Sequence, residues 1–181
     1  MKKMIVGLVG KKGSGKDTMA DFLVENYHFK QYAYAEPLKK LCQDLFSLTD
    51  AQVNCHVLKE TIDERWSKSP RQILQQVGTD LFRKHYDENI WVKILKEKLK
   101  MESKDQNIVV SDIRHQNELD TVTEFNNCVI FRILRPGHDA SDPHSTENNT
   151  LTYENMITID NNGSIQDFHE KIHKELKHII Y

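Results

Sequence analysis

A run of glycines and lysines near the start of the chain has the spacing of a phosphate-binding loop. Residues 10–18 read Gly-Lys-Lys-Gly-Ser-Gly-Lys-Asp-Thr and lie between an apolar run, residues 4–9, and a helix-like stretch. A glycine-rich turn that opens a helix directs successive backbone N–H groups at one anion, and Lys16 adds a mobile positive charge for the outer phosphates of a nucleoside triphosphate. The alternative, a glycine turn with solvated lysines, leaves the strand before it and the helix after it unexplained. We therefore predict nucleotide binding.

Carboxylates beside this loop predict a site for Mg²⁺. Asp17 stands where the common pattern has Ser or Thr, and Asp112 ends the apolar run 108–111 and is followed by Arg114. Hard divalent cations seek oxygen ligands near phosphates, and an arginine can neutralise charge on a transferring phosphoryl group. The alternatives are an ordinary acidic first turn at Asp17 and a surface Asp–Arg pair. We interpret Asp17 and Asp112 as metal ligands, and both of them with Lys16 and Arg114 as catalytic.

A further arginine follows the apolar run 128–134. Arg135 precedes Pro136, which stops strand pairing, so we expect Arg135 at the end of the sheet, in contact with a donor phosphate or adenine. The residues that we predict to bind the donor nucleotide are Gly10, Lys11, Gly13, Ser14, Gly15, Lys16, Asp17, Thr18 and Arg135.

A second polar and cationic stretch, residues 64–83, predicts a helix with a binding face. Ser69 is a typical N-cap and Pro70 a typical first helical residue. The face that results, at four-residue spacing, carries Arg71, Gln75, Thr79 and Arg83, flanked by Arg65 and Trp66. Arginine forks suit a phosphate, and amide or hydroxyl groups suit base edges. The alternative is a solvated helix face.

Gly78 favours the binding interpretation of this helix. A glycine in mid-helix weakens it by about 1 kcal/mol, so it indicates a close approach by a ligand or by neighbouring backbone. The apolar residues of the same stretch recur at helical spacing and predict one buried stripe of Ile73, Leu74, Val77, Leu81 and Phe82.

The elements that position these residues alternate between strands and helices. Strand-like runs cover residues 4–9, 31–35, 108–111, 128–134 and 156–159, and the helical stretches between them predict an α/β fold whose parallel sheet is covered on both faces. The long helical segment 36–103 indicates an inserted module, and the polar segment 136–152 a lid. We expect one domain with a core of about 1–35, 104–135 and 153–181.

Composition narrows the classes of partner. Lys and Arg number 25 against 27 Asp and Glu, for a net charge of −2, which argues against a nucleic-acid-coating protein and favours a small ligand. The three cysteines form no CxxC pair, so we expect a reducing, cytoplasmic environment. No apolar run is long enough for a membrane span. The amphipathic C-terminal helix could serve a homodimer, although a core role is favoured.

A literal H-E-x-x-H occurs at residues 169–173, the spacing of zinc-protease helices. No third ligand is identified, and Phe168, Ile172 and Leu176 commit the helix to packing. Surface histidines near a helix C-terminus are the favoured interpretation.

At this point the sequence resembles the bacteriophage-type deoxynucleoside monophosphate kinases of the P-loop kinase class. The matching segments, in order, are Gly-Lys-Asp-Thr at 15–18, Tyr-Ala-Glu-Pro-Leu-Lys at 34–39, Ser-Pro-Arg at 69–71 through Arg83, Ile-Trp-Val at 90–92, Ser-Asp-Ile-Arg at 111–114 with Asn-Glu at 117–118, Arg-Pro at 135–136 and His-Ser-Thr-Glu at 144–147. Glu36 and Thr146 stand where Asp and Ser are more familiar in that family.

The resemblance implies a three-layer P-loop kinase fold with a five-stranded parallel sheet, a helical monophosphate-binding insertion and a lid. It also implies ATP and Mg²⁺ as cofactors and a deoxynucleoside 5′-monophosphate as acceptor, in viral DNA precursor synthesis in the host cytoplasm. The acceptor-binding residues expected in this sequence are Glu36, Lys39, Arg65, Trp66, Arg71, Gln75, Thr79, Arg83 and Trp91.

Two other functions fit parts of the same sequence. A kinase for another phosphorylated small molecule, such as dephospho-CoA or phosphomevalonate, would share the core, but Trp66 and Gln75 favour a base in the acceptor site. A nucleotide-dependent switch would not need the second cationic region, and the N-K-x-D base motif of GTP-binding switches is absent from the sequence.

Overall fold

The computed structural model describes residues 3–136 and 151–180. Residue 180 is described by its backbone alone. The chain divides into two compact units: a core unit, up to Ala33 and from Lys96 onward, and a helical unit, Tyr34–Leu95. Most of the predicted lid, residues 137–150 with the segment His144–Glu147, lies outside the described residues.

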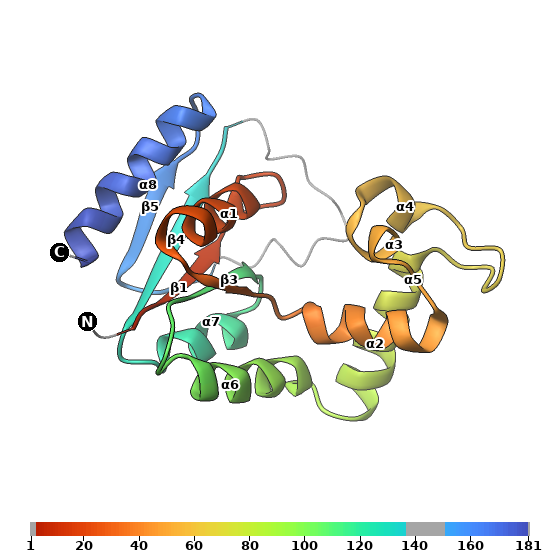
Figure 1. Ribbon diagram of the computed structural model, residues 1–181. Coiled ribbons are helices and arrows are strands. Elements are labelled where there is room, and N and C mark those ends of the chain that lie inside the picture. The colour runs from red at the N-terminus through yellow and green to blue at the C-terminus, as the bar shows by residue number, and fades with distance from the viewer. Residues whose placement is uncertain (1–2, 137–150, 181) are drawn as a thin grey trace. The chain divides into compact units, whose positions relative to one another are not determined.

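The core unit is built on a five-stranded sheet with the order β2-β3-β1-β4-β5, and every pairing is parallel (Figure 1). This confirms the predicted fold class. The strands are β1 (Ile5–Val9), β2 (Lys30–Tyr32), β3 (Ile108–Ile113), β4 (Cys128–Leu134) and β5 (Met156–Asp160). All five residues of β1 are buried, as a central parallel strand covered on both faces requires.

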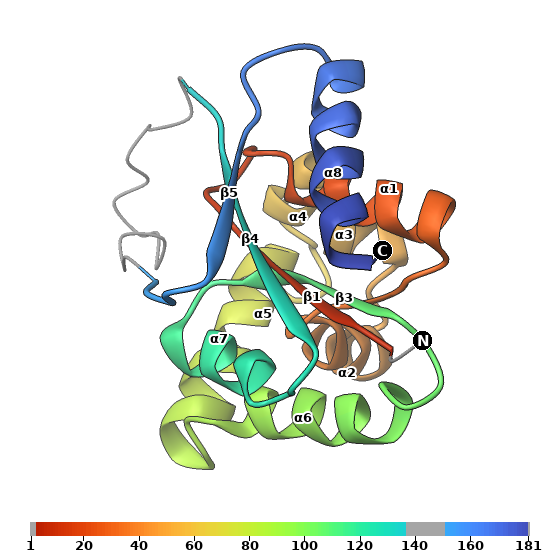
Figure 2. The same cartoon turned by 90° about the vertical axis from the view of Figure 1, so that its left-hand side faces the viewer.

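Helices cover both faces of this sheet. Figures 1 and 2 show α1 (Lys16–Tyr27) and α8 (Ile165–Ile180) on one face and α7 (Gln116–Thr123) on the other. The main core lies under α1 and α8 and joins, among others, Val6, Leu8, Met19, Leu23, Phe131, Ile133, Phe168 and Ile172. A Cβ on Gly7 would lie 2.7 Å from Ile130 Cδ1 and 3.4 Å from Val122 of α7, so glycine is needed for close packing on the second face.

The helical unit consists of short helices around a small core of its own. These are α2 (Glu36–Phe46), α3 (Asp50–Asn54), α4 (His56–Glu60), α5 (Pro70–Gln75) and a π-helix, η1 (Gln76–Arg83). Its core comprises Cys42, Leu48, Val53, Ile73, Leu74 and Val77. The helix α6 (Ile90–Glu102) begins in this unit and continues into the core unit.

Local signals explain where α5 begins, and the prediction for that end is confirmed. The hydroxyl of Ser69 accepts a hydrogen bond from Gln72 N at 3.3 Å, and Gln72 Oε1 accepts one from Ser69 N at 2.9 Å. This reciprocal capping box satisfies two N–H groups that the first turn would otherwise leave unpaired. Pro70 occupies the first helical position.

The predicted buried stripe is wrong at Leu81, which is 58% exposed. Residues 76–83 form a π-helix, in which hydrogen bonds run from i to i+5 and the turn is wider than in an α-helix. The residue that follows Val77 on the buried side is therefore Phe82, whose ring packs on Trp91 with centroids 5.3 Å apart.

Candidate nucleotide-binding site

Backbone conformation shapes the predicted phosphate loop. Gly13 and Gly15 have φ angles of 78° and 111°, a left-handed region that glycine enters without steric cost. Ser14 N donates a hydrogen bond to Lys11 O at 3.1 Å, which closes the turn. Gly15 is the N-cap of α1 and supplies no side-chain cap, so the positive end of the α1 dipole lies directly behind the loop.

Lys16, the first residue of α1, folds its side chain back over the loop. Its Nζ donates to the carbonyl oxygens of Gly10 and, at 2.8 Å, of Lys11. Its ammonium therefore already lies at the loop. A phosphate that binds there would meet this charge and the N-terminus of α1 together.

Two side chains from the far half of the sequence donate hydrogen bonds to backbone carbonyls of the loop. Arg135 donates to Gly13 O at 3.3 Å, so the structure brings this predicted residue to the loop. Asn161, directly after β5, donates from Nδ2 to Ser14 O at 2.8 Å. Sequence reasoning missed Asn161, because nothing in the local sequence indicates that the end of β5 lies beside residues 13–15.

The ends of β1 and β3 place Asp112 close to the start of the loop. Val9 pairs with Ile113 in the parallel register, and Asp112 is half-buried just before it, whereas Asp17 is exposed in the first turn of α1. The described residues contain no cluster of three or more His, Cys, Asp or Glu side chains able to hold a metal. Because Mg²⁺ is bound through one or two carboxylates together with phosphates and water, this donor set fits Mg²⁺.

A buried carboxylate fixes the segment that follows β3. Glu118 is 3% exposed, and its Oε2 accepts hydrogen bonds from Arg114 N at 2.8 Å and His115 N at 3.1 Å. These bonds cap the start of α7 and orient the exposed Arg114. Glu118 was not among the predicted site residues, although its spacing three residues after the N-cap is typical of a capping box.

The predicted acceptor residues all lie in the helical unit, where Arg71 forms an ion pair with Glu60 through its Nε. Both side chains are partly exposed, at 39% and 46%. Glu60 contacts Arg71 at Nε, so the edge of the guanidinium formed by its two terminal nitrogens is not the one that this ion pair uses. This geometry suits a two-pronged contact with a phosphate.

The helix type keeps the predicted face together. In an α-helix, four-residue steps drift by about 40° each, but the wider π-helical turn of residues 76–83 counters that drift. Gln75 and Thr79 are exposed and Arg83 is half-buried. Gly78 is explained by packing: a Cβ there would lie 2.5 Å from Leu38 Cδ2. The close neighbour is thus a side chain of α2, not the ligand or backbone that the sequence indicated.

Arg65 and Trp66 are tied to neighbouring groups of the helical unit. Arg65 donates to both carboxylate oxygens of Asp63, at 2.9 and 2.6 Å. This fork, together with a bond from Gln52, holds the pKa of Asp63 well below its usual range. The Trp66 indole donates to Phe46 O at 3.0 Å and meets the Phe46 ring edge-on at 5.2 Å. These contacts favour structural roles for both residues.

The other three predicted acceptor residues differ in exposure. Glu36 is exposed in the first turn of α2, and Lys39 is half-buried and donates to Asn54 Oδ1 at 2.8 Å. Trp91 is 4% exposed, and its indole donates to Gly78 O at 3.1 Å. Its burial favours a supporting role beneath the π-helix over direct contact with a substrate.

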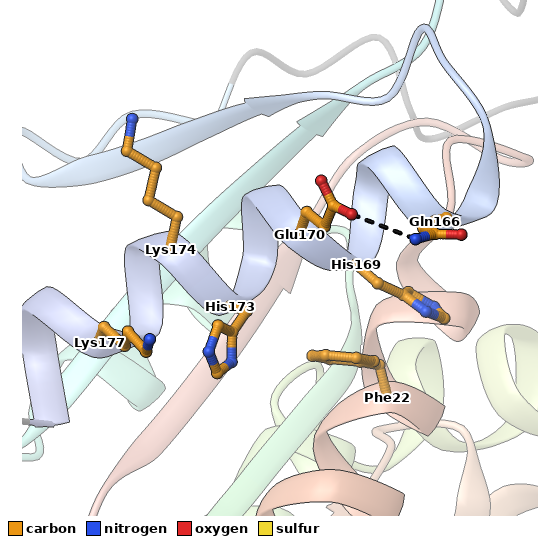
Figure 3. Close-up of a pocket in the computed structure, with 7 residues that line it drawn as sticks. All are labelled: Phe22, Gln166, His169, Glu170, His173, Lys174 and Lys177. Atoms are coloured by element: carbon orange, nitrogen blue, oxygen red, sulfur yellow. Dashed lines mark hydrogen bonds between the residues drawn. The ribbon is translucent and has the colours of Figure 1, made fainter.

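The H-E-x-x-H segment lies on the outer surface of α8, beside a groove of about 400 Å³ (Figure 3). The ring of His169 stacks on Phe22 with centroids 4.4 Å apart, and His173 Nδ1 is hydrogen-bonded to Tyr27 OH. Glu170 accepts from Gln166 at 3.3 Å and points away from the two rings. The histidines therefore contact Phe22 and Tyr27 of α1, a packing role that the surface interpretation of this motif did not include. No helix of the described residues is long and apolar enough to span a membrane.

Comparison with known proteins places the chain in one family. The family model described as deoxynucleotide monophosphate kinase matches residues 3–62 and 42–172. A protein of the Acanthamoeba polyphaga mimivirus with the same family name is 37% identical over 93% of this chain and 94% of its own length. The deoxynucleotide monophosphate kinase of Enterobacteria phage T4 is 25% identical over 96% and 98%.

Solved structures agree on the fold. A sugar kinase from Janibacter has a TM-score of 0.54 at 13% identity and covers 97% of this chain and 95% of its own. The dephospho-CoA kinase of Campylobacter jejuni has a TM-score of 0.52 at 14% identity and covers 97% and 96%. At such identity the likeness establishes the kinase fold alone. With the family match over almost its whole length, the chain belongs to the deoxynucleotide monophosphate kinase family.

Proposed function

We propose that this protein transfers the γ-phosphoryl group of ATP, in the presence of Mg²⁺, to a deoxynucleoside 5′-monophosphate and so forms the diphosphate. The observation that carries the proposal is the glycine-rich loop between β1 and α1, with Lys16 folded over it, in a chain of this family. The names of its relatives support the acceptor. Such an enzyme would work in the cytoplasm, that of the host if the protein is viral.

The donor would bind in the core unit. Lys16 and the N-terminus of α1 would hold the β- and γ-phosphates, and Arg135, already in contact with the loop at Gly13 O, would add positive charge beside them. Asp17 and Asp112 would hold Mg²⁺, directly or through water, and the bound ion would supply charge neutralisation on the phosphates.

Transfer would need no side-chain nucleophile. The acceptor phosphate is ionised near neutral pH, so positioning and charge neutralisation are the main tasks of the protein. Arg114, fixed at its backbone by Glu118, would stabilise the transferring group. Asp112 would orient groups, not abstract a proton.

The acceptor would bind in the helical unit. Arg71 and Arg83 would bind its phosphate and Gln75 and Thr79 its base edges, while Glu36 and Lys39 would contact the sugar or base. Arg65, Trp66 and Trp91 would support this face from within the unit, as their contacts with Asp63, Phe46 and Gly78 favour.

The proposal is tested by incubating the protein with Mg-ATP and each ribo- and deoxynucleoside monophosphate in turn, and separating the products chromatographically. We expect at least one deoxynucleoside diphosphate to accumulate with an equal amount of ADP. Dephospho-CoA and phosphomevalonate serve as the alternative acceptors. Phosphorylation of either of these, with no turnover of any monophosphate, would overturn the assignment.

A further inference from the structure

We propose that Asn161 is a positioning residue of the phosphate loop, which fixes the peptide between Ser14 and Gly15 so that its N–H faces the bound phosphates. This inference rests on the proposed nucleotide binding at residues 10–18. It extends the site to the segment after β5, which none of the sequence motifs includes.

Asn161 is held at both its backbone and its side chain. Its N–H donates to Leu134 O, at the end of β4, at 2.7 Å, and its Nδ2 donates to Ser14 O at 2.8 Å. A single residue thus links the ends of two neighbouring strands to the loop. A Cβ on Gly15 would lie 2.5 Å from the same Nδ2, so the amide fills the space that the glycine leaves.

The surroundings of Asn161 keep the amide in this place. Lys171, on α8, donates to Asp160 O at 2.7 Å and to Asn162 Oδ1 at 3.1 Å. Ser164 and Asp167 then bond reciprocally, Ser164 N to Asp167 Oδ2 at 2.9 Å and Asp167 N to Ser164 Oγ at 3.1 Å. The segment 160–164 is therefore anchored on both sides of the amide.

The consequence for the loop follows from peptide geometry. In a planar trans peptide the C=O and N–H bonds point to opposite sides. Because Asn161 donates to Ser14 O, the Gly15 N–H is directed away from the Asn161 amide. In our proposal this N–H joins the successive N–H groups that form a concave site for an anion in a loop of this kind. Without the amide, this peptide could rotate, since glycine at position 15 imposes little resistance.

The side-chain type matters as well as the contact. An amide offers the N–H donor that a carbonyl requires, whereas a carboxylate has only acceptors when ionised. Aspartate at this position would therefore repel Ser14 O and bring a negative charge to the back of a phosphate site. Alanine would only remove the bond.

The test measures binding of Mg-ADP by isothermal titration calorimetry, which needs no turnover. A net hydrogen bond of this kind predicts a loss of affinity of about three- to tenfold for Asn161→Ala. Asn161→Asp should lose about thirtyfold or more. The matched control, Gln166→Ala, removes an exposed amide of α8 that lies outside the segment 160–164 and should stay within about twofold of the parent protein.

A purely structural role would give a different pattern. In that case Asn161→Ala would lower the melting temperature but leave the Mg-ADP affinity and the KM values for ATP and the monophosphate unchanged. Our proposal predicts a rise in KM for ATP alone. Equal affinities of Asn161→Ala and the parent protein would overturn the inference, whereas failure of the parent to bind Mg-ADP would overturn the nucleotide site itself.

Discussion

The phosphate loop and the α5–η1 helix both present positive charge, but their shapes have different origins. The loop is set by its own three glycines, all of them at positive φ, and needs only a few outside hydrogen bonds. The face on α5–η1 depends on contacts from elsewhere, namely Trp91 at Gly78 O and Leu38 against the Gly78 backbone. The shape of the loop can therefore be predicted from its sequence motif, whereas the shape of the α5–η1 face depends on tertiary packing.

The same difference separates the two ends of the α5–η1 helix. Its start is governed by a capping box between Ser69 and Gln72, which are only three positions apart in the sequence. Its second half is π-helical, a conformation that is uncommon and frequently associated with function. Substitutions in the loop should therefore change the rate of phosphoryl transfer. Substitutions in the helical unit should change the affinity for the acceptor or the stability of the protein.

The largest effect is expected from Lys16→Met. Loss of the ammonium removes charge stabilisation at the transferring phosphates, and one such contact is worth about 10²–10³ in rate. Thermal unfolding should be nearly unchanged, because the folded loop is set mainly by its backbone. The measurement is kcat with Mg-ATP, compared with Lys104→Met, an exposed lysine of the same unit. Near-normal turnover of Lys16→Met would show that the phosphate loop does not stabilise the transferring phosphates.

Arg71→Gln should raise KM for the monophosphate by about ten- to a hundredfold, because charge-assisted hydrogen bonds contribute about 1.5–3 kcal/mol. KM for ATP should change little. Lys84→Gln is the control, since Lys84 forms an exposed i,i+4 pair with Asp80 and such pairs contribute little. If both variants behave alike, the α5–η1 face is an ordinary solvated surface.

Trp91→Phe should destabilise the protein by about 1–3 kcal/mol, because it leaves the buried acceptor Gly78 O without its donor. For a chain of this size that corresponds to a fall in melting temperature of about 2–4 °C per kcal/mol. Trp66→Phe also loses an indole bond to a carbonyl, but Trp66 is 39% exposed and water can replace the donor. Equal effects in calorimetry would contradict a special role for packing under the π-helix.

The smallest effect concerns acid stability and Asp63. Its pKa is lowered first by the hydrogen bonds from Arg65, so its contribution to stability is present above the unfolded-state pKa of about 4 and is lost as the pH falls further. Asp63→Asn should therefore flatten the decline of the unfolding free energy below about pH 4, and Arg65→Gln should do the same. Urea titrations at several pH values measure this slope, and an unaltered slope in both variants would refute the pairing.

Much of the core unit is predictable from sequence because its signals are local or periodic. The apolar runs gave β4 at residues 128–134 without error and the other strands within a few residues, and the glycine spacing located the loop. The stripe on α8, with Phe168, Ile172 and Leu176 buried, followed from helical periodicity.

The remainder depends on neighbours that are distant in sequence. Asn161 lies 147 positions from Ser14, so its contact becomes visible only when β5 is placed in the sheet. Leu81 was expected in the core because the periodicity of an α-helix was assumed. The roles assigned to Arg71, Gln75, Thr79 and Arg83 stay predictions, since the chemistry of a helix face depends on what binds there.

The anchoring of the loop by Asn161 and Arg135 has a thermodynamic consequence. Fixing the backbone of one residue costs roughly 1–2 kcal/mol in conformational entropy. With Ser14 O and Gly13 O already held by side chains of the folded chain, the loop loses this freedom when the protein folds and not when a nucleotide arrives. Binding of the phosphates should therefore carry a small entropic penalty, and weakening the Asn161 anchor should make the binding entropy more unfavourable, because the loop would then become ordered only when the nucleotide binds.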